Sequence, residues 1–167
     1  MTDPAAPAAR RYYGRFAGIV RDNDDPEHLC RIDAEVPELL DGTTGWCLPA
    51  SPYAGDGVGF AVVPPLGALV WIEWPGGDLG QPPVWAGGAW TAGNPVDGAG
   101  PGKLLVVTPG GHRIELDDDG TSMTLTSAGG PVITLDSSGV NIDSGQGSTI
   151  SMQSGKVSIN DGALTVS

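Results

Sequence analysis

Carboxylates are the side chains in this sequence whose types and spacing come nearest to a site for chemistry. Residues 117–120 are Asp-Asp-Asp-Gly, like a fragment of a calcium loop, and residues 22–27 hold four more acids. Contiguous carboxylates project in different directions, and no glutamate follows Asp117 at the spacing of a bidentate calcium ligand. We therefore predict two solvated turns and no metal site.

The other reactive side chains do not form a catalytic set. Serine is abundant, but there is no G-x-S-x-G nucleophile motif. Paired carboxylates for glycoside hydrolysis would need a cleft with two distinct environments. The narrow rod that we predict below for the C-terminal part of the chain does not offer such a cleft. Two cysteines, Cys30 and Cys47, are too few for a disulfide framework or a four-ligand metal site. Cys30 alternates in phase with Ile32, Ala34 and Val36, which predicts a small buried apolar thiol. The sequence predicts a protein that is not an enzyme and needs no cofactor.

Five tryptophans, at positions 46, 71, 74, 85 and 90, suggest a stacking platform for bases or sugars. The charge opposes this interpretation for nucleic acid, because 20 Asp and Glu stand against 8 Lys and Arg, for a net charge of −12. Phosphate binding depends on Lys and Arg. We predict no nucleic-acid partner and assign most tryptophans to a hydrophobic core or to contacts between subunits.

The last third of the chain, residues 112–167, is a repeat of apolar pairs whose members lie two positions apart. The pairs are Ile114/Leu116, Met123/Leu125, Ile133/Leu135, Val140/Ile142, Ile150/Met152, Val157/Ile159 and Leu164/Val166. Alternation within a pair predicts a short strand with one apolar face. Successive pairs begin nine, ten, seven, ten, seven and seven residues apart. Repetition at such short intervals indicates a solenoid or a fibre.

One chain of seven such strands has too little apolar surface for a core of its own. A single-chain β-helix of the hexapeptide type would need steps of six, and none occurs. We therefore predict an intertwined trimeric β-helix in which three identical chains place these pairs around one axis as the trimer core. At roughly 4.7–4.9 Å between strands, the rod would be on the order of 30 Å long. The alternative is a β-sandwich, which needs longer strands.

The N-terminal half predicts a small all-β barrel. Short alternating segments bounded by Gly or Pro cover residues 12–21, 29–36, 45–51, 58–63, 68–74 and 84–90, and no stretch has a helical period. This pattern suits an OB-fold. The segment 68–74 is apolar on both faces, and its second face, with Leu69 and Trp71, needs cover from another subunit or protein.

The fold class predicted is thus all-β, with four parts. Residues 1–11 form a flexible Pro- and Ala-rich segment, and residues 12–90 form the OB-fold. Residues 91–103 are a Gly- and Pro-rich linker, and residues 104–167 form the trimeric β-helix. No apolar run approaches the ~20 residues of a membrane span and no signal peptide is present, which predicts a protein made in the cytoplasm.

Several segments resemble one known family in the same order. They are YYGRFAGIV at 12–20, DP at 25–26, RI at 31–32, VP at 36–37, GW at 45–46, PASPYAG at 49–55, PPLGALVWIE at 64–73, GD at 77–78, PPV at 82–84 and GHRIELDD at 111–118. Together they resemble phage baseplate assembly protein V, the central tail-spike protein and VgrG, over residues 12–167. Cys30 stands where this family usually has Gly and Cys47 where it usually has Ala.

The resemblance implies a trimeric spike at the centre of the baseplate of a contractile injection system. The OB-fold would dock on the baseplate hub and the inner tube, with Leu69 and Trp71 as the candidate hub or inter-subunit contact. The spike would meet the target envelope only on firing. The resemblance also implies assembly in the cytoplasm into a phage tail-like particle, which can be extracellular after release.

The tip follows from the same resemblance. Some short spikes of this family bind iron through a His-x-His motif, and the histidines here, His28 and His112, do not form one. We expect a blunt end at Leu164, Val166 and Ser167 on which a separate tip protein of the PAAR type docks.

A function of another class stays open at this point. The chain could be an OB-fold binding module for single-stranded nucleic acid or oligosaccharide, with a β-rich tail for oligomerisation. Five arginines in the barrel half, among many acids, disfavour the nucleic-acid form of this alternative. A spike-borne hydrolase is a weaker option, since the sequence has no spare domain for it.

Overall fold

The structure is a computed structural model that describes residues 10–166. Contacts divide the chain into two units, Met1–Gly93 and Asn94–Ser167, which we describe one at a time. The division falls inside the predicted linker 91–103. Of the predicted flexible segment 1–11, residues 1–9 lie outside the described part. Arg11 is held by an ion pair with Asp78 at 2.8 Å, and the amide of Tyr12 donates to the Gly77 carbonyl.

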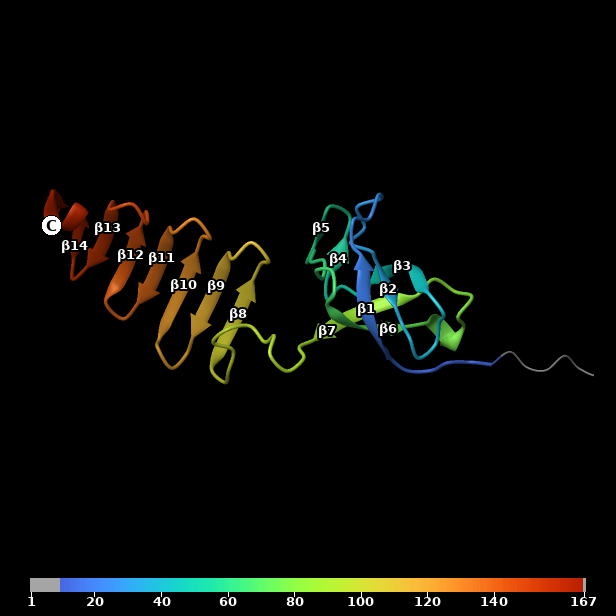
Figure 1. Cartoon of the computed structure of the whole chain (residues 1–167). Coiled ribbons are helices and arrows are strands. Elements are labelled where there is room, and N and C mark those ends of the chain that lie inside the picture. The colour runs from blue at the N-terminus through green and yellow to red at the C-terminus, as the bar shows by residue number, and fades with distance from the viewer. Residues whose placement is uncertain (1–9, 167) are drawn as a thin grey trace, which may run out of the picture. The chain divides into compact units, whose positions relative to one another are not determined.

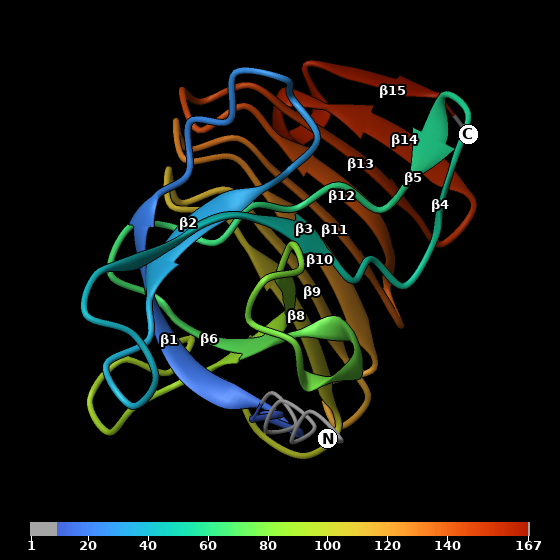
Figure 2. The same cartoon turned by 90° about the vertical axis from the view of Figure 1, so that its right-hand side faces the viewer.

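The first unit is a closed five-stranded barrel with the order β1-β2-β3-β7-β6 (Figures 1 and 2). Its strands are β1 (Phe16–Asp22), β2 (Ile32–Glu35), β3 (Thr43–Pro49), β6 (Leu69–Glu73) and β7 (Val84–Ala89). Neighbours are antiparallel except β3 and β7, which run parallel. Closure pairs every strand on both sides, so the barrel has no free edge.

Alternation along the strands fills the barrel as the sequence predicts. The buried core consists of Val20, Ile32, Ala34, Val36, Cys47, Val70, Ile72, Trp74 and Trp85. Gly18 allows β1 to approach β6 closely, because a Cβ there would lie 2.8 Å from Cγ1 of Ile72. The glycine is therefore a packing requirement of a small barrel.

One predicted barrel strand, residues 58–63, was wrong. Val58 and Gly59 form β5 of a separate two-stranded hairpin with β4 (Ala54–Gly55), and residues 60–63 follow it without regular secondary structure, outside the barrel ladder. Val58, Phe60 and Val62 are each about half exposed. A short 3-10 turn, η1 (Pro75–Gly77), follows β6.

The second unit is one antiparallel sheet of eight strands, in which each strand pairs with the next along the chain. The strands are β8 (Lys103–Val107), β9 (Arg113–Asp117), β10 (Ser122–Thr126), β11 (Val132–Asp136), β12 (Gly139–Asp143), β13 (Thr149–Gln153), β14 (Lys156–Ile159) and β15 (Leu164–Val166). A 3-10 turn, η2 (Asn160–Gly162), precedes β15. The sheet begins one strand earlier than the seven predicted pairs, because β8 adds Leu104 and Val106.

The turns of this sheet lie along its two borders, where the strands end, and we call these borders side A and side B. Side A carries the turns 108–112, 127–131, 144–148 and 160–163. Side B carries the turns 118–121, 137–138 and 154–155, of which the last two are tight. A five-residue turn on side A gives a step of ten between apolar pairs, and a two-residue turn on side B gives a step of seven. The middle steps of ten, seven, ten and seven thus follow the alternation of sides. The first step of nine and the last step of seven cross the four-residue turns 118–121 and 160–163.

The tight turn before β12 depends on Gly139. Its φ is +142°, and a Cβ built there would lie 2.0 Å from the Met152 carbonyl oxygen on β13. Gly147, in a side A turn, also has a positive φ of +91° but has nothing within 4 Å of its Cβ position.

We expect Gly139→Ala to destabilise the C-terminal sheet far more than Gly147→Ala. Both substitutions strain a left-handed backbone, but only the first forces two strands apart, which costs on the order of 2 kcal/mol beyond the shared strain. Thermal unfolding followed by circular dichroism measures the difference. Equal melting temperatures for the two variants would show that β12 and β13 are not this closely packed.

The predicted all-β class is confirmed. In the single chain, hydrogen bonds join successive strands of the same sheet, so the C-terminal unit is a meander. The intertwined β-helix stays a prediction about the assembled trimer.

Candidate functional site

The apolar pairs form two continuous columns on one face of the C-terminal sheet. Column A, next to side A, is Val106, Ile114, Leu125, Ile133, Ile142, Ile150, Ile159 and Leu164. Column B, next to side B, is Leu104, Leu116, Met123, Leu135, Val140, Met152, Val157 and Val166. Each member is the direct cross-strand partner of the next member of its column. All fourteen predicted core residues therefore share one face.

This face is not covered within the chain. Among the described residues of 94–166, none reaches the buried class, and Met123 and Leu125 are 50% and 45% exposed. A sheet normally buries its apolar face against a second layer. An apolar surface that follows all eight strands marks a protein–protein contact.

The opposite face is polar, and the ion pairs of this unit lie on it at β8 and β9. The Lys103 ammonium lies 2.8 Å from Asp117 and 2.9 Å from Glu115, and Arg113 Nε donates to Glu115 at 3.0 Å. Hydrogen bonds from Lys103 lower the pKa of both carboxyls, and the carboxylates raise the pKa of Lys103. Beyond these strands the face is mostly Ser, Thr and Asn, such as Thr134 and Asn141. These side chains suit a solvent-facing surface.

The proposed tip end lies on the last strand. Leu164 and Val166 in β15 are 55% and 61% exposed, and β15 has a partner on one edge only. Ser167, the third residue assigned to this end, lies outside the described residues.

Leu69 and Trp71 lie on β6 with their side chains on the outer face of the barrel. Both are half-buried, whereas Val70 and Ile72 between and beside them are fully buried in the core. The structure thus places the two candidate contact residues on one strand and one face.

The acidic turn 22–27 differs from its prediction as a solvated turn. Asp25 is 5% exposed and accepts hydrogen bonds from the backbone amides of Glu27, Leu29 and Arg31. The Arg31 guanidinium binds the same carboxylate at 2.6 Å and lies over the Trp46 ring. The Arg31 hydrogen bonds hold the pKa of Asp25 well below its usual range. Asp25 therefore organises the loop as a buried structural anion.

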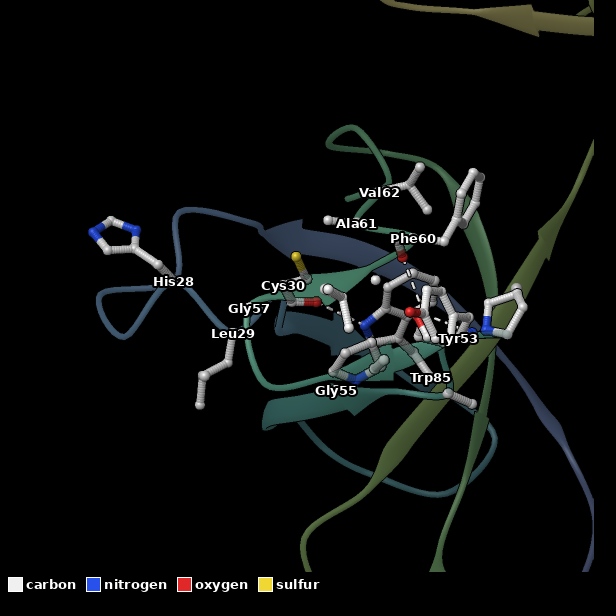
Figure 3. A pocket seen from close by; sticks show the side chains of 18 residues that line it. His28, Leu29, Cys30, Tyr53, Gly55, Gly57, Phe60, Ala61, Val62 and Trp85 are labelled. Atoms are coloured by element: carbon white, nitrogen blue, oxygen red, sulfur yellow. Dashed lines mark hydrogen bonds between the residues drawn. The ribbon is translucent and has the colours of Figure 1, made fainter.

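That loop borders an apolar hollow of about 660 Å3 on the barrel (Figure 3). Tyr53, Phe60 and Val62 from the β4–β5 region line it together with Trp85, whose Nε1 donates to the Cys30 carbonyl at 3.0 Å. The His28 ring points away from it (Figure 3). The sequence does not reveal this hollow, because residues 58–63 alternate like a strand of the barrel.

The two cysteines differ from each other. Cys47 is fully buried, and burial raises the pKa of its thiol to about 11, which keeps it protonated. Cys30 is only half-buried and has a φ of +58°. The prediction of a fully buried Cys30 was wrong, because a left-handed residue ends the alternation just before β2. A glycine would take this φ without strain.

The turn 117–120 is held by its own backbone. The Asp117 carboxylate accepts a hydrogen bond from the Gly120 amide at 2.9 Å and pairs with Lys103, while Asp118 and Asp119 are exposed. Within residues 10–166, no three His, Cys, Asp or Glu side chains come together as a metal site. In the same part of the chain, no helix has the length and apolarity to cross a membrane.

Two family models match consecutive parts of the chain. The type VI secretion system/phage-baseplate injector OB domain matches residues 16–90, which contain the barrel. The phage baseplate V C-terminal trimerisation domain matches residues 103–165, which contain the eight-stranded sheet. No curated protein matches the chain. Because both models describe parts of one baseplate protein and together account for most of this sequence, the chain belongs to the phage baseplate V family of structural baseplate proteins.

Proposed function

We propose that the protein is the trimeric central spike of a contractile injection system. One observation carries this proposal: the apolar face of the C-terminal sheet is uncovered along all eight strands, within the segment that matches a trimerisation domain. A second layer from two other copies satisfies this face. The polar opposite face then becomes the outer surface of the rod.

Trimerisation provides both stability and stiffness. Each Å2 of apolar surface that is buried contributes about 25 cal/mol, and all sixteen column residues of each chain would contribute at once. The strands of each chain are already paired by hydrogen bonds. The assembled rod therefore has few ways to open locally, which suits a part that is driven through a target envelope.

The barrel would attach this rod to the baseplate hub and the inner tube. We place this contact on the outer face of β6, at Leu69 and Trp71, which are half-buried apolar side chains without a full cover in the chain. At the other end, Leu164 and Val166 would receive a PAAR-type tip protein. The role is mechanical, without catalysis or a cofactor. The protein would assemble in the cytoplasm into a phage tail-like particle that is released from the cell.

The hub contact makes one prediction. A Leu69→Glu/Trp71→Glu double variant should still form trimers but lose co-purification with the hub complex of its own particle, because two charges would have to be desolvated there. The same change at Tyr53, on the β4–β5 hairpin, is the matched control. Normal hub binding by the double variant would move the contact to another face.

The trimer itself is tested by light scattering on the purified chain, before and after heating in SDS. We expect a mass of three times 17.0 kDa that resists SDS. A monomer would leave the sixteen column residues without a partner and would overturn the proposed function.

A further inference from the structure

We propose that column A of one chain packs against column B of the next chain, in a head-to-tail ring of three. This inference rests on the proposed trimer and adds its contact map: which half of each apolar face touches which half of its neighbour. It predicts that like columns never meet.

The two columns differ in the kind of side chain that they present. Column A holds five isoleucines among its eight residues, whereas column B holds no isoleucine and both of the methionines of the sheet. β-branched side chains are stiff, and methionine is flexible enough to fill irregular gaps. Six of the eight residues of column A are β-branched, against three valines in column B, so column A is the stiffer ridge and packs more closely against column B than against a copy of itself.

Cyclic symmetry leads to the same pairing. In a ring of three identical chains, every contact is heterologous, so one side of each chain meets the other side of the next. A sheet that faces the axis with two columns must therefore bring column A of one copy beside column B of another. In a dimer in which two such sheets face each other and their long axes run in opposite directions, like columns would instead come together.

Each column is flanked by a hollow that the neighbouring column can enter. On side A, a hollow of about 350 Å3 is lined by Val106, Ile114, Leu125 and Ile133 under the turn residue Pro131. On side B, a hollow of about 510 Å3 lies beside Leu116, Met123 and Leu135. These hollows are open in the single chain, and in the proposed trimer the adjacent chain covers them.

Charge at the two ends of β9 is complementary in the same direction. His112 and Arg113 stand on side A, and Asp117, Asp118 and Asp119 stand on side B. Contact between side A and side B places the basic end of one strand near the acidic end of the next copy. Asp117 is already paired with Lys103, so contact between like sides would place the exposed Asp118 and Asp119 carboxylates opposite those of another copy.

Paired cysteines at these ends test the map on the full-length chain. In a Cys30→Ser background, with Cys47 buried, His112→Cys/Asp118→Cys trimers are treated with a short bis-maleimide and run on a denaturing gel. We expect covalent trimers. Either single variant should remain monomeric on the gel, because its cysteines all lie on like sides.

A mismatched pair measures the register. His112→Cys/Ser154→Cys uses the same two sides, but the two turns lie on the order of 20 Å apart along the sheet. It should crosslink roughly tenfold more slowly than the matched pair, because its thiols have a lower effective concentration.

Three results would separate the possibilities. Efficient crosslinking of the His112→Cys single variant would show that like sides meet, and would overturn the proposed map. A trimer by light scattering in which the matched pair does not crosslink would also overturn it, while the proposed function would stand. A monomer before any crosslinking would overturn the proposed function itself.

Discussion

Ile142→Asp should convert the protein from a trimer of three times 17.0 kDa into a monomer with an intact barrel. Ile142 lies in the middle of column A, with cross-strand partners Ile133 and Ile150. Three symmetry-related carboxylates would be placed in one layer of the apolar core, and each buried charge costs several kcal/mol to desolvate. Ile133→Asp should have the same effect one strand away.

Light scattering gives the mass, and tryptophan fluorescence reports on the barrel alone, since all five tryptophans precede residue 91. Asn141→Asp is the matched control, because it adds the same charge to the opposite face of the same strand. We expect it to remain trimeric. An Ile142→Asp trimer that withstands SDS like the parent would show that column A does not face the axis.

Asp25→Asn should remove much of the pH dependence of barrel stability in acid. The pKa of Asp25 is lowered in the folded state, mainly by Arg31, so folding favours its ionised form. The stabilisation is fully present above the unfolded pKa, about 3.9, and is lost as the pH falls below it toward the folded pKa. The parent barrel should therefore weaken below about pH 4 more steeply than the variant.

Urea unfolding between pH 2 and pH 7, followed by the fluorescence of Trp74 and Trp85, measures this difference. At neutral pH the variant should already unfold at lower urea, because Arg31 loses its charged partner. Asp56→Asn, in the exposed turn between β4 and β5, is the control and should follow the parent. Parallel pH profiles for parent and Asp25→Asn would contradict the role of Asp25 as a buried anion.

The sequence was sufficient to predict which residues form the apolar columns, because period-two alternation in a short segment directly indicates a strand with one apolar face. It was not sufficient for the path of the chain between strands. The step lengths do not reveal on which side the chain turns, because the step of seven from Val157 to Leu164 turns on side A and the other steps of seven turn on side B. The choice between a meander and an intertwined helix depends on the pairing of the strands.

Two local errors have physical causes that alternation does not reveal. Residues 58–63 alternate like a barrel strand, but the ring closes through β7 pairing with β3, which leaves them outside. Asp25 looks like a solvated turn residue because acids in turns normally are. The positive φ angles of His28 and Cys30 bend the loop so that three backbone amides converge on this carboxylate. No simple sequence pattern predicts these two φ angles.

The alternation of turns on the two sides also sets the unit by which such a rod can change in length. Ile133 and Ile150 occupy equivalent places in column A and lie 17 residues apart, as do Val140 and Val157 in column B. Duplication of 17 residues would add one hairpin and about 9.5 Å of rod while returning the chain to the same side. Insertion of a single strand would instead exchange the two sides for everything downstream. Genetic lengthening of the rod should therefore proceed in whole hairpins, which makes its reach a stepwise quantity.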